Sequence, residues 1–151
     1  YQIDEGVQAI QIFDSWVGCL SVSDYRNHVF AHSKKLLDSI SGKVPVIHFG
    51  TGNPSLLPLM KEAGGDVMAL DWRAPLKESW ELLGCKAVQG NMDPIALFGS
   101  VDSVRQAARL ILEEVGGRPG HIFNLGHGIL PETPVENVKA LVEFVQGYQT
   151  S

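Results

Sequence analysis

The stretch Gly120-His121-Ile122-Phe123-Asn124-Leu125-Gly126-His127-Gly128-Ile129 sets a short apolar run directly before a histidine that lies between two glycines. Such a run of β-branched and aromatic residues predicts a buried strand at residues 121–125. We expect Gly126 and Gly128 to adopt backbone angles closed to other residues and to leave room for a ligand. His127 would then stand at a strand end, where binding sites are built.

Four similar runs precede this one, and predicted helices separate them. The five runs lie at residues 9–13, 45–49, 67–70, 86–89 and 121–125. Helical periodicity and end signals place helices at residues 24–40, 53–63, 75–83, 101–115 and 134–146. Thr133-Pro134-Val135-Glu136 has the spacing of a capping box at the start of the last helix. The alternation of strands and helices predicts an α/β fold.

Five βα units fit either an open doubly wound sheet or part of a (β/α)8 TIM barrel, whose complete form needs about 250 residues. Neither GxGxxG nor GxxxxGK[ST] occurs, which removes the commonest nucleotide-binding reasons for an open sheet. Polar or aromatic residues follow nearly every run, and in a barrel they would converge on one rim: Asp14 and Ser15, Thr51 and Asn53, Asp71 and Trp72, Asn91 and Asp93, and His127.

Composition excludes several classes of protein. With 151 residues, 44% of them hydrophobic, the chain is long enough for one domain with a core. A net charge of -5 and no basic cluster longer than Lys34-Lys35 argue against nucleic-acid binding. No apolar run approaches the ~18 residues of a membrane span. Cys19 and Cys85 form no CxxC pair, so we expect free thiols in a reducing cytosol and no metal site.

Each candidate side chain also has a purely structural interpretation. An aspartate at a strand–helix junction commonly caps the next helix; Asp14 and Asp71 are candidate acids or bases, but for Asp71 we favour the capping role. We expect His48, inside an apolar run, to be a hydrogen-bonded core or rim histidine. Ser15 lacks a Gly-x-Ser-x-Gly elbow and is better suited to bind a ligand than to act as a nucleophile. For His127 we favour a ligand-binding role, since an imidazole near neutral pH can donate from both nitrogens.

Four segments together closely resemble the uroporphyrinogen decarboxylase family, in order and in spacing. They are Gln11-Ile12-Phe13-Asp14-Ser15-Trp16-Val17-Gly18, Leu70-Asp71-Trp72, Gln89-Gly90-Asn91-Met92-Asp93-Pro94 and Gly120-His121-Ile122-Phe123-Asn124-Leu125-Gly126-His127-Gly128-Ile129. The resemblance covers essentially the whole chain. It implies that residues 1–151 are the C-terminal portion of a single (β/α)8 barrel domain, about its last five βα units.

The resemblance also implies an activity and a site. The family removes the four acetate carboxyl groups of uroporphyrinogen III to give coproporphyrinogen III in haem biosynthesis, without a metal or organic cofactor, and we expect a cytoplasmic homodimer. Phe13 and Ser15 match the family's substrate-contacting Phe-x-Ser segment, and His127 matches its substrate-contacting histidine, our candidate catalytic residue. The family's aspartate, arginine cluster and tyrosine belong to the part of the barrel outside this chain. We therefore expect this chain to be inactive alone.

Two other hypotheses stay open. The related corrinoid and thiol methyltransferases bind zinc through His-x-Cys and a later cysteine, whereas His48-Phe49-Gly50 has glycine at the cysteine position. Alternatively, the chain is a non-catalytic fragment or dimerisation unit, such as half of a split enzyme. Five strands of an open barrel would expose two unpaired edges, so we expect the chain to need a partner, swap strands or aggregate.

Overall fold

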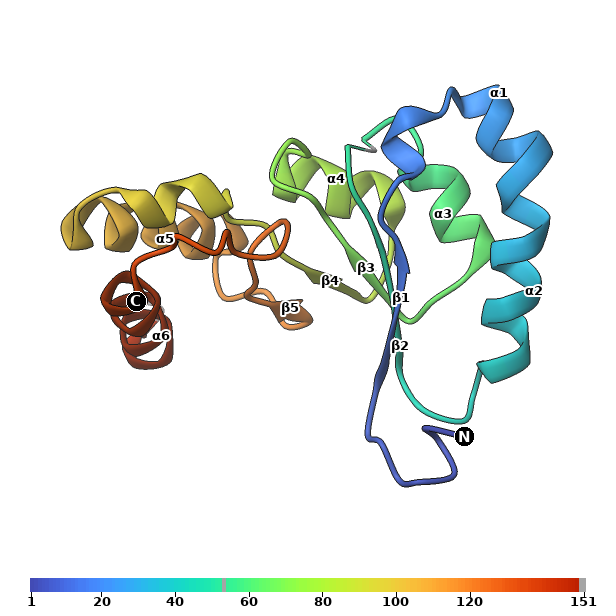
Figure 1. Ribbon diagram of the computed structural model, residues 1–151, viewed down its shortest axis with the longest axis horizontal. Helices are drawn as coiled ribbons and strands as arrows, with labels where there is room; N and C mark the ends of the chain where they lie inside the picture. The colour runs from blue at the N-terminus through green and yellow to red at the C-terminus, as the bar shows by residue number, and fades with distance from the viewer. Residues whose placement is uncertain (53, 150–151) are drawn as a thin grey trace.

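The computed structural model describes residues 1–52 and 54–149, and within them five parallel strands form one sheet. The strands lie side by side in chain order: β1 (Ile10–Asp14), β2 (Val46–Gly50), β3 (Val67–Ala69), β4 (Ala87–Gln89) and β5 (His121–Ile122). Helical segments separate consecutive strands along the chain (Figure 1). The α/β prediction is therefore confirmed, and the arrangement is consistent with part of a barrel.

The helices follow the predicted order. Between β1 and β2 the chain forms α1 (Val22–Asp24), a π-helical segment η2 (Tyr25–Val29) and α2 (Phe30–Ile40). The later helices are α3 (Leu57–Ala63), α4 (Leu76–Leu83), α5 (Val101–Val115) and α6 (Val135–Gly147), with short 3-10 helices η1 (Val17–Cys19) and η3 (Pro94–Phe98). Gly84 and Gly116 end α4 and α5 in the left-handed conformation, as the glycine signals predicted. Among the described residues, no helix is long and apolar enough to cross a membrane.

Some predicted boundaries are wrong. α3 begins at Leu57 rather than at residue 53, because Pro58 fits only the first turn of a helix, where its missing N–H is not needed. Asn53 itself lies outside the described residues. The capping box also fails: Pro134 holds the cap position, and the buried Thr133 hydroxyl has no hydrogen-bond partner in the described part of the chain.

The last strand is shorter than predicted. β5 ends at Ile122, and the chain continues through residues 123–125 as an irregular segment with one isolated bridge between Met92 and Leu125. The backbone N–H of Met92 donates to the carbonyl of Asn124 at 3.1 Å, which keeps this segment against the loop that follows β4. The approach to His127 is therefore a supported loop rather than a strand.

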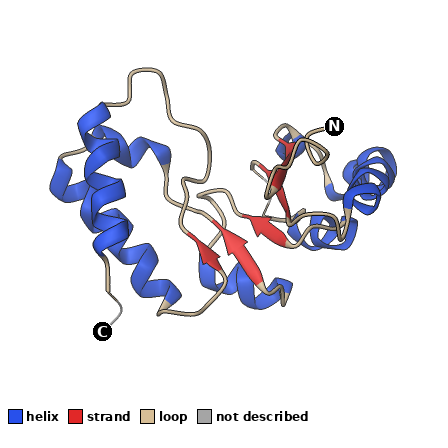
Figure 2. Cartoon of the chain, turned by 90° about the horizontal axis from the view of Figure 1, so that it is seen from below, coloured by secondary structure: helices blue, strands red, loops and turns tan. Residues whose placement is uncertain are grey.

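The sheet is curved, and its two faces differ. In Figure 2 helices lie to the left, below and to the right of the strands, and none lies above them. On the opposite, inner face the Gln89 amide of β4 donates to the Gln11 side-chain oxygen of β1 at 3.1 Å. In a flat sheet, strands separated by two others lie about 14 Å apart, so this contact fits a sheet that bends toward its inner face.

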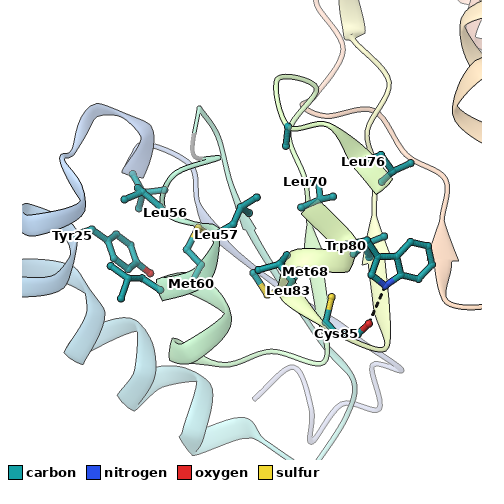
Figure 3. Packing of buried hydrophobic residues seen from close by; sticks show 14 residues of the cluster. Tyr25, Leu56, Leu57, Met60, Met68, Leu70, Leu76, Trp80, Leu83 and Cys85 are labelled. Carbon is teal, nitrogen blue, oxygen red and sulfur yellow. Dashed lines mark hydrogen bonds between the residues drawn. The ribbon is translucent and has the colours of Figure 1, made fainter. Parts of the chain in front are cut away.

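The helix-covered face holds the main core. Buried side chains from η2, α3, β3 and α4 pack together there, and Figure 3 shows Met60, Met68 and Trp80 among them. The Trp80 indole N–H donates to the Cys85 carbonyl at 2.9 Å, which satisfies its one polar atom inside the core. Each fully buried Leu or Met side chain contributes about 1.5–3 kcal/mol. A second cluster, which includes Leu97, Val104, Ala108 and Leu141, holds α5 against α6.

Candidate functional site

The loops that follow the five strands meet at one edge of the sheet, because parallel strands carry their carboxyl ends there. Hydrogen bonds join neighbouring loops along this rim. They run from the Thr51 hydroxyl to the Ser15 carbonyl, from the Gly52 N–H to the Asp71 carboxylate (2.5 Å), from the Asn91 amide to the Asp71 carbonyl (3.0 Å), and from the Gly126 N–H to the Met92 carbonyl (2.8 Å). The loops after the strands therefore converge as predicted, and these hydrogen bonds join them into one rim.

Four aromatic rings form a row along this rim. Phe13 and Phe49, which are register partners on β1 and β2, make an edge contact with ring centroids 5.7 Å apart. The His127 ring lies against Phe49 at 6.2 Å and against Trp72 at 6.3 Å, both in edge geometry. Such contacts orient an imidazole without using its nitrogens. His127 itself is exposed, so both nitrogens remain open to a ligand.

Gly126 positions His127, but not in the predicted way. Neither Gly126 nor Gly128 has a positive φ angle, and the space beside Gly126 is filled by the chain itself rather than left for a ligand. A Cβ at Gly126 would lie 2.3 Å from the Trp72 backbone nitrogen. Glycine is therefore required because the loop after β5 touches the loop after β3. At Gly128 a Cβ would meet nothing within 4 Å.

Asp71 is structural, but it does not cap α4 as predicted. Its buried carboxylate accepts the N–H of Gly52 at 2.5 Å and the N–H of Arg73 at 2.7 Å. Pro75 stands at the start of α4, and no side chain caps that helix. Asp71 therefore ties the loop after β2 to the loop after β3 and fixes the backbone on which Trp72 stands.

Arg73 is a rim residue that the sequence analysis missed. Its guanidinium donates to the Asp71 carboxylate at 2.7 Å and lies 3.9 Å from the centroid of the Trp72 ring. The side chain is still 53% exposed. Its place in the sequence, directly after Asp71-Trp72 at a strand end, was the available signal. Arg73 supplies a positive charge at the rim.

Asp14 and His48 lie behind the rim, on the helix-covered side of the sheet. The His48 Nε2 is 2.9 Å from the Asp14 carboxylate, and its Nδ1 faces the carbonyl oxygens of Met60 and Gly64 at 3.2 and 3.1 Å. Asp14 also accepts the Ser33 hydroxyl of α2 at 3.0 Å. The prediction that His48 is a hydrogen-bonded core histidine is confirmed, whereas Asp14 does not join the rim as predicted.

Two pKa shifts accompany this buried pair. Burial acts to raise the pKa of Asp14, but the hydrogen bond and charge of His48, with smaller contributions from Ser33 and Tyr25, outweigh it and hold that pKa below its ordinary value. Burial, together with the Asp14 charge, raises the pKa of Tyr25 to about 12. Asp14 is therefore held as a carboxylate by its partners, which is a structural arrangement.

Phe13 and Ser15 border hollows around the carboxyl end of β1. Phe13 is 65% exposed, which is unusual for a phenylalanine inside a strand. A hollow of about 490 Å³ is lined by residues 13–17, 19, 20 and 29, and a second, of about 400 Å³, by Ser15, Trp16, Gly18, Cys19, Thr51, Gly52 and Arg73. The structure thus brings Phe13 and His127 into one aromatic row, whereas Ser15 lies beside it at the end of β1.

The arrangement around His48 bears on the zinc hypothesis. Both ring nitrogens of His48 are already engaged, so this side chain has no lone pair directed at a metal. Among the described residues, no three His, Cys, Asp or Glu side chains gather in a way that could hold a metal ion. Cys85, the cysteine that follows His48 in the chain, is a buried thiol just before β4, and burial raises its pKa.

Comparisons with known proteins agree on one family. The model of the family described as uroporphyrinogen decarboxylase (URO-D) matches residues 1–148. A uroporphyrinogen decarboxylase of Koribacter versatilis is 52% identical over 99% of the chain, and one of Carboxydothermus hydrogenoformans is 53% identical over 95% of it. The chain spans only 43% and 42% of the lengths of these two relatives.

A solved structure supports the same fold. The methyltransferase from Methanosarcina mazei aligns with 95% of this chain at a TM-score of 0.80 and 26% identity, and the alignment covers 43% of that protein. The curated relatives are about twice as similar in sequence, and they carry the decarboxylase name. Since the family match extends over nearly every residue, the chain belongs to the uroporphyrinogen decarboxylase family.

Proposed function

We propose that this chain is the C-terminal part of a (β/α)8 barrel whose complete form is a uroporphyrinogen decarboxylase. Family membership, the five βα units and the curved sheet support this proposal. The chain spans under half of its relatives, and β1 and β5 are the two edges of its sheet. Three further strands would close a barrel on those edges.

The observation that carries the proposal is the placement of His127. Its exposed ring is held by Phe49 and Trp72 at the rim, in line with Phe13. We propose that His127 donates a hydrogen bond to a carboxylate or pyrrole group of the substrate and is the catalytic residue on this side of the site. Phe13 would offer a flat apolar surface to the macrocycle, and Ser15 a hydroxyl to a polar substituent.

The chemistry of the substrate explains why such positioning is sufficient. Protonation of the pyrrole carbon beside the acetate-bearing carbon makes the ring cationic. The electron pair of the C–CO2 bond then enters the ring as CO2 leaves, and protonation of the resulting methylene with loss of the ring proton restores the pyrrole. The pyrrole is the electron sink, so this route uses no cofactor. The protein has to bind carboxylates, place a proton donor and exclude water.

The proposal includes a location and an assembly. A cytoplasmic location is consistent with the redox state of the cysteines, since Cys19 and Cys85 are both free thiols. We also propose that the complete barrel is a homodimer, as the family resemblance implies.

Activity measurements on two proteins test the proposal. One is this chain alone; the other, here called the joined barrel, is this chain fused to the part of the Koribacter versatilis relative that lies outside the matched region. We expect coproporphyrinogen from the joined barrel and none from the chain alone. Mixing the two parts as separate polypeptides is a second arm that does not depend on the fusion point. Turnover by the chain alone would contradict the proposal that it holds only part of the site, and inactivity of both assembled forms would contradict the assigned function.

The methyltransferase and fragment hypotheses make different predictions. A zinc-dependent methyltransferase would bind zinc stoichiometrically, and metal analysis of the purified joined barrel would detect it. The likeness to the Methanosarcina mazei methyltransferase is the observation in its favour, whereas the engaged nitrogens of His48 oppose it. A purely structural fragment would support assembly without any dependence of turnover on His127.

A further inference from the structure

We propose that Arg73 binds a carboxylate of the tetrapyrrole substrate. This inference rests on the proposed function and adds a binding residue on the loop after β3. The guanidinium of Arg73 stands beside Trp72, whose ring touches His127, so both lie along the same stretch of the rim. Arginine suits this task because its planar fork of N–H donors matches a carboxylate.

Arg73 is held in place from two sides. Its Nη1 donates to the buried Asp71 carboxylate at 2.7 Å, and its guanidinium carbon lies 3.9 Å from the centre of the Trp72 ring. Asp71 is in turn fixed by the backbone N–H groups of Gly52 and Arg73. A guanidinium held in this way loses less rotational freedom when it binds a ligand.

The guanidinium has more donors than its partner uses. One N–H group is directed at Asp71, and the side chain remains 53% exposed. It borders the hollow of about 400 Å³ that Ser15 and Trp16 also line, and none of the described residues that line this hollow carries a carboxylate. Neutralising Asp71 accounts for the Nη1 contact but not for the place of Arg73 in the lining of the hollow.

The substrate has the matching chemistry. Uroporphyrinogen carries four acetate and four propionate side chains, all ionised near neutral pH, and the acetates are the groups removed. Either kind of carboxylate could reach an arginine at the barrel mouth. The two cases differ experimentally, because the product coproporphyrinogen retains only the propionates.

Variants of the joined barrel test this assignment. The probes are uroporphyrin and coproporphyrin, which are unreactive oxidised forms of substrate and product, and fluorescence titration gives their Kd. We expect Arg73→Gln to raise the uroporphyrin Kd and the uroporphyrinogen KM about tenfold, roughly 1.4 kcal/mol, with kcat changed less than about threefold. Arg73→Lys should restore part of the affinity. Arg105→Gln is the matched control, since Arg105 on α5 is 46% exposed and carries the same charge away from the rim.

The results distinguish an acetate contact from a propionate contact. They also distinguish a failure of the Arg73 assignment from a failure of the proposed function. If Arg73 binds an acetate, only uroporphyrin binding weakens; if it binds a propionate, coproporphyrin binding weakens as well. Both results support the assignment. An Arg73→Gln protein that binds both porphyrins as tightly as Arg105→Gln overturns it, and a lower Tm with unchanged Kd would leave Arg73 as a neutralising partner of Asp71. A parent joined barrel that neither binds uroporphyrin nor decarboxylates would instead refute the proposed function itself.

Discussion

His48, on β2, and His127, whose ring lies against Phe49 of the same strand, have opposite surroundings. On the helix-covered side, His48 is fully buried, and its nitrogens face Asp14 and two backbone carbonyls. At the rim, His127 is exposed, and its ring lies edge-on to the rings of Phe49 and Trp72. The nitrogens of the first histidine are engaged by the protein, whereas the second histidine is exposed at the rim.

This difference follows from the alternation of side chains along a strand. Ile12 pairs with His48 on one face, and Phe13 pairs with Phe49 on the other. Adjacent residues therefore have separate surroundings: one face of β1 and β2 packs against the helices, and the other carries the aromatic rings of the rim. The comparison predicts that substitutions behind the sheet change stability and that substitutions at the rim change activity.

The largest expected effect is on stability, from His48→Leu. Removing this ring takes the buried imidazole away from the Asp14 carboxylate, which keeps the Ser33 hydroxyl, and from the carbonyl oxygens of Met60 and Gly64. The loss should lower the free energy of unfolding by roughly 2–4 kcal/mol. Urea denaturation of the joined barrel measures this loss. His32→Leu, at an exposed histidine of α2, is the control and should change stability by less than about 0.5 kcal/mol. Equal stability of the two variants would contradict the distinction between the faces.

The next effect is on turnover, from His127→Leu. Loss of a positioned hydrogen-bond donor at a reacting group should lower kcat of the joined barrel by about 100-fold. The unfolding free energy should change by less than about 0.5 kcal/mol, because the ring is exposed. His127→Asn retains a donor and should recover part of the rate. A destabilised but fully active His127→Leu protein would reverse the roles assigned to the two histidines.

The elements of the fold could be predicted from the sequence because short apolar runs and terminal glycines are local signals. The starts of β1, β2 and β4 each fall within a residue of the prediction. The pairing of Asp14 with His48 could not be predicted, because it joins residues 34 positions apart through the register of β1 and β2. The same holds for Gly126, whose need for glycine comes from the neighbouring loop.

The candidate site was predicted in part. His127 was singled out by its flanking glycines, but its orientation depends on Phe49 of β2 and on Trp72 in the loop after β3. Arg73 was missed because a single arginine after a strand resembles ordinary surface charge. Only its contacts with Asp71 and Trp72 distinguish it.

The smallest predicted effect concerns pH and Asp14. Its folded-state pKa is lowered from 3.8, so the unfolded chain takes up a proton at a higher pH than the folded protein does. The stabilisation by this carboxylate is therefore present above about pH 3.8 and is lost as the pH falls through the folded-state pKa. We expect Asp14→Asn to lower the unfolding free energy of the joined barrel by on the order of 1 kcal/mol at pH 7, and this deficit to shrink in acid. Asp38→Asn, at an exposed aspartate of α2, is the control and should cost little at either pH. If the unfolding free energy lost by Asp14→Asn stayed constant down to the acid transition, the prediction would be contradicted. The negative charge of Asp14 would then contribute nothing to its stabilising contact with His48.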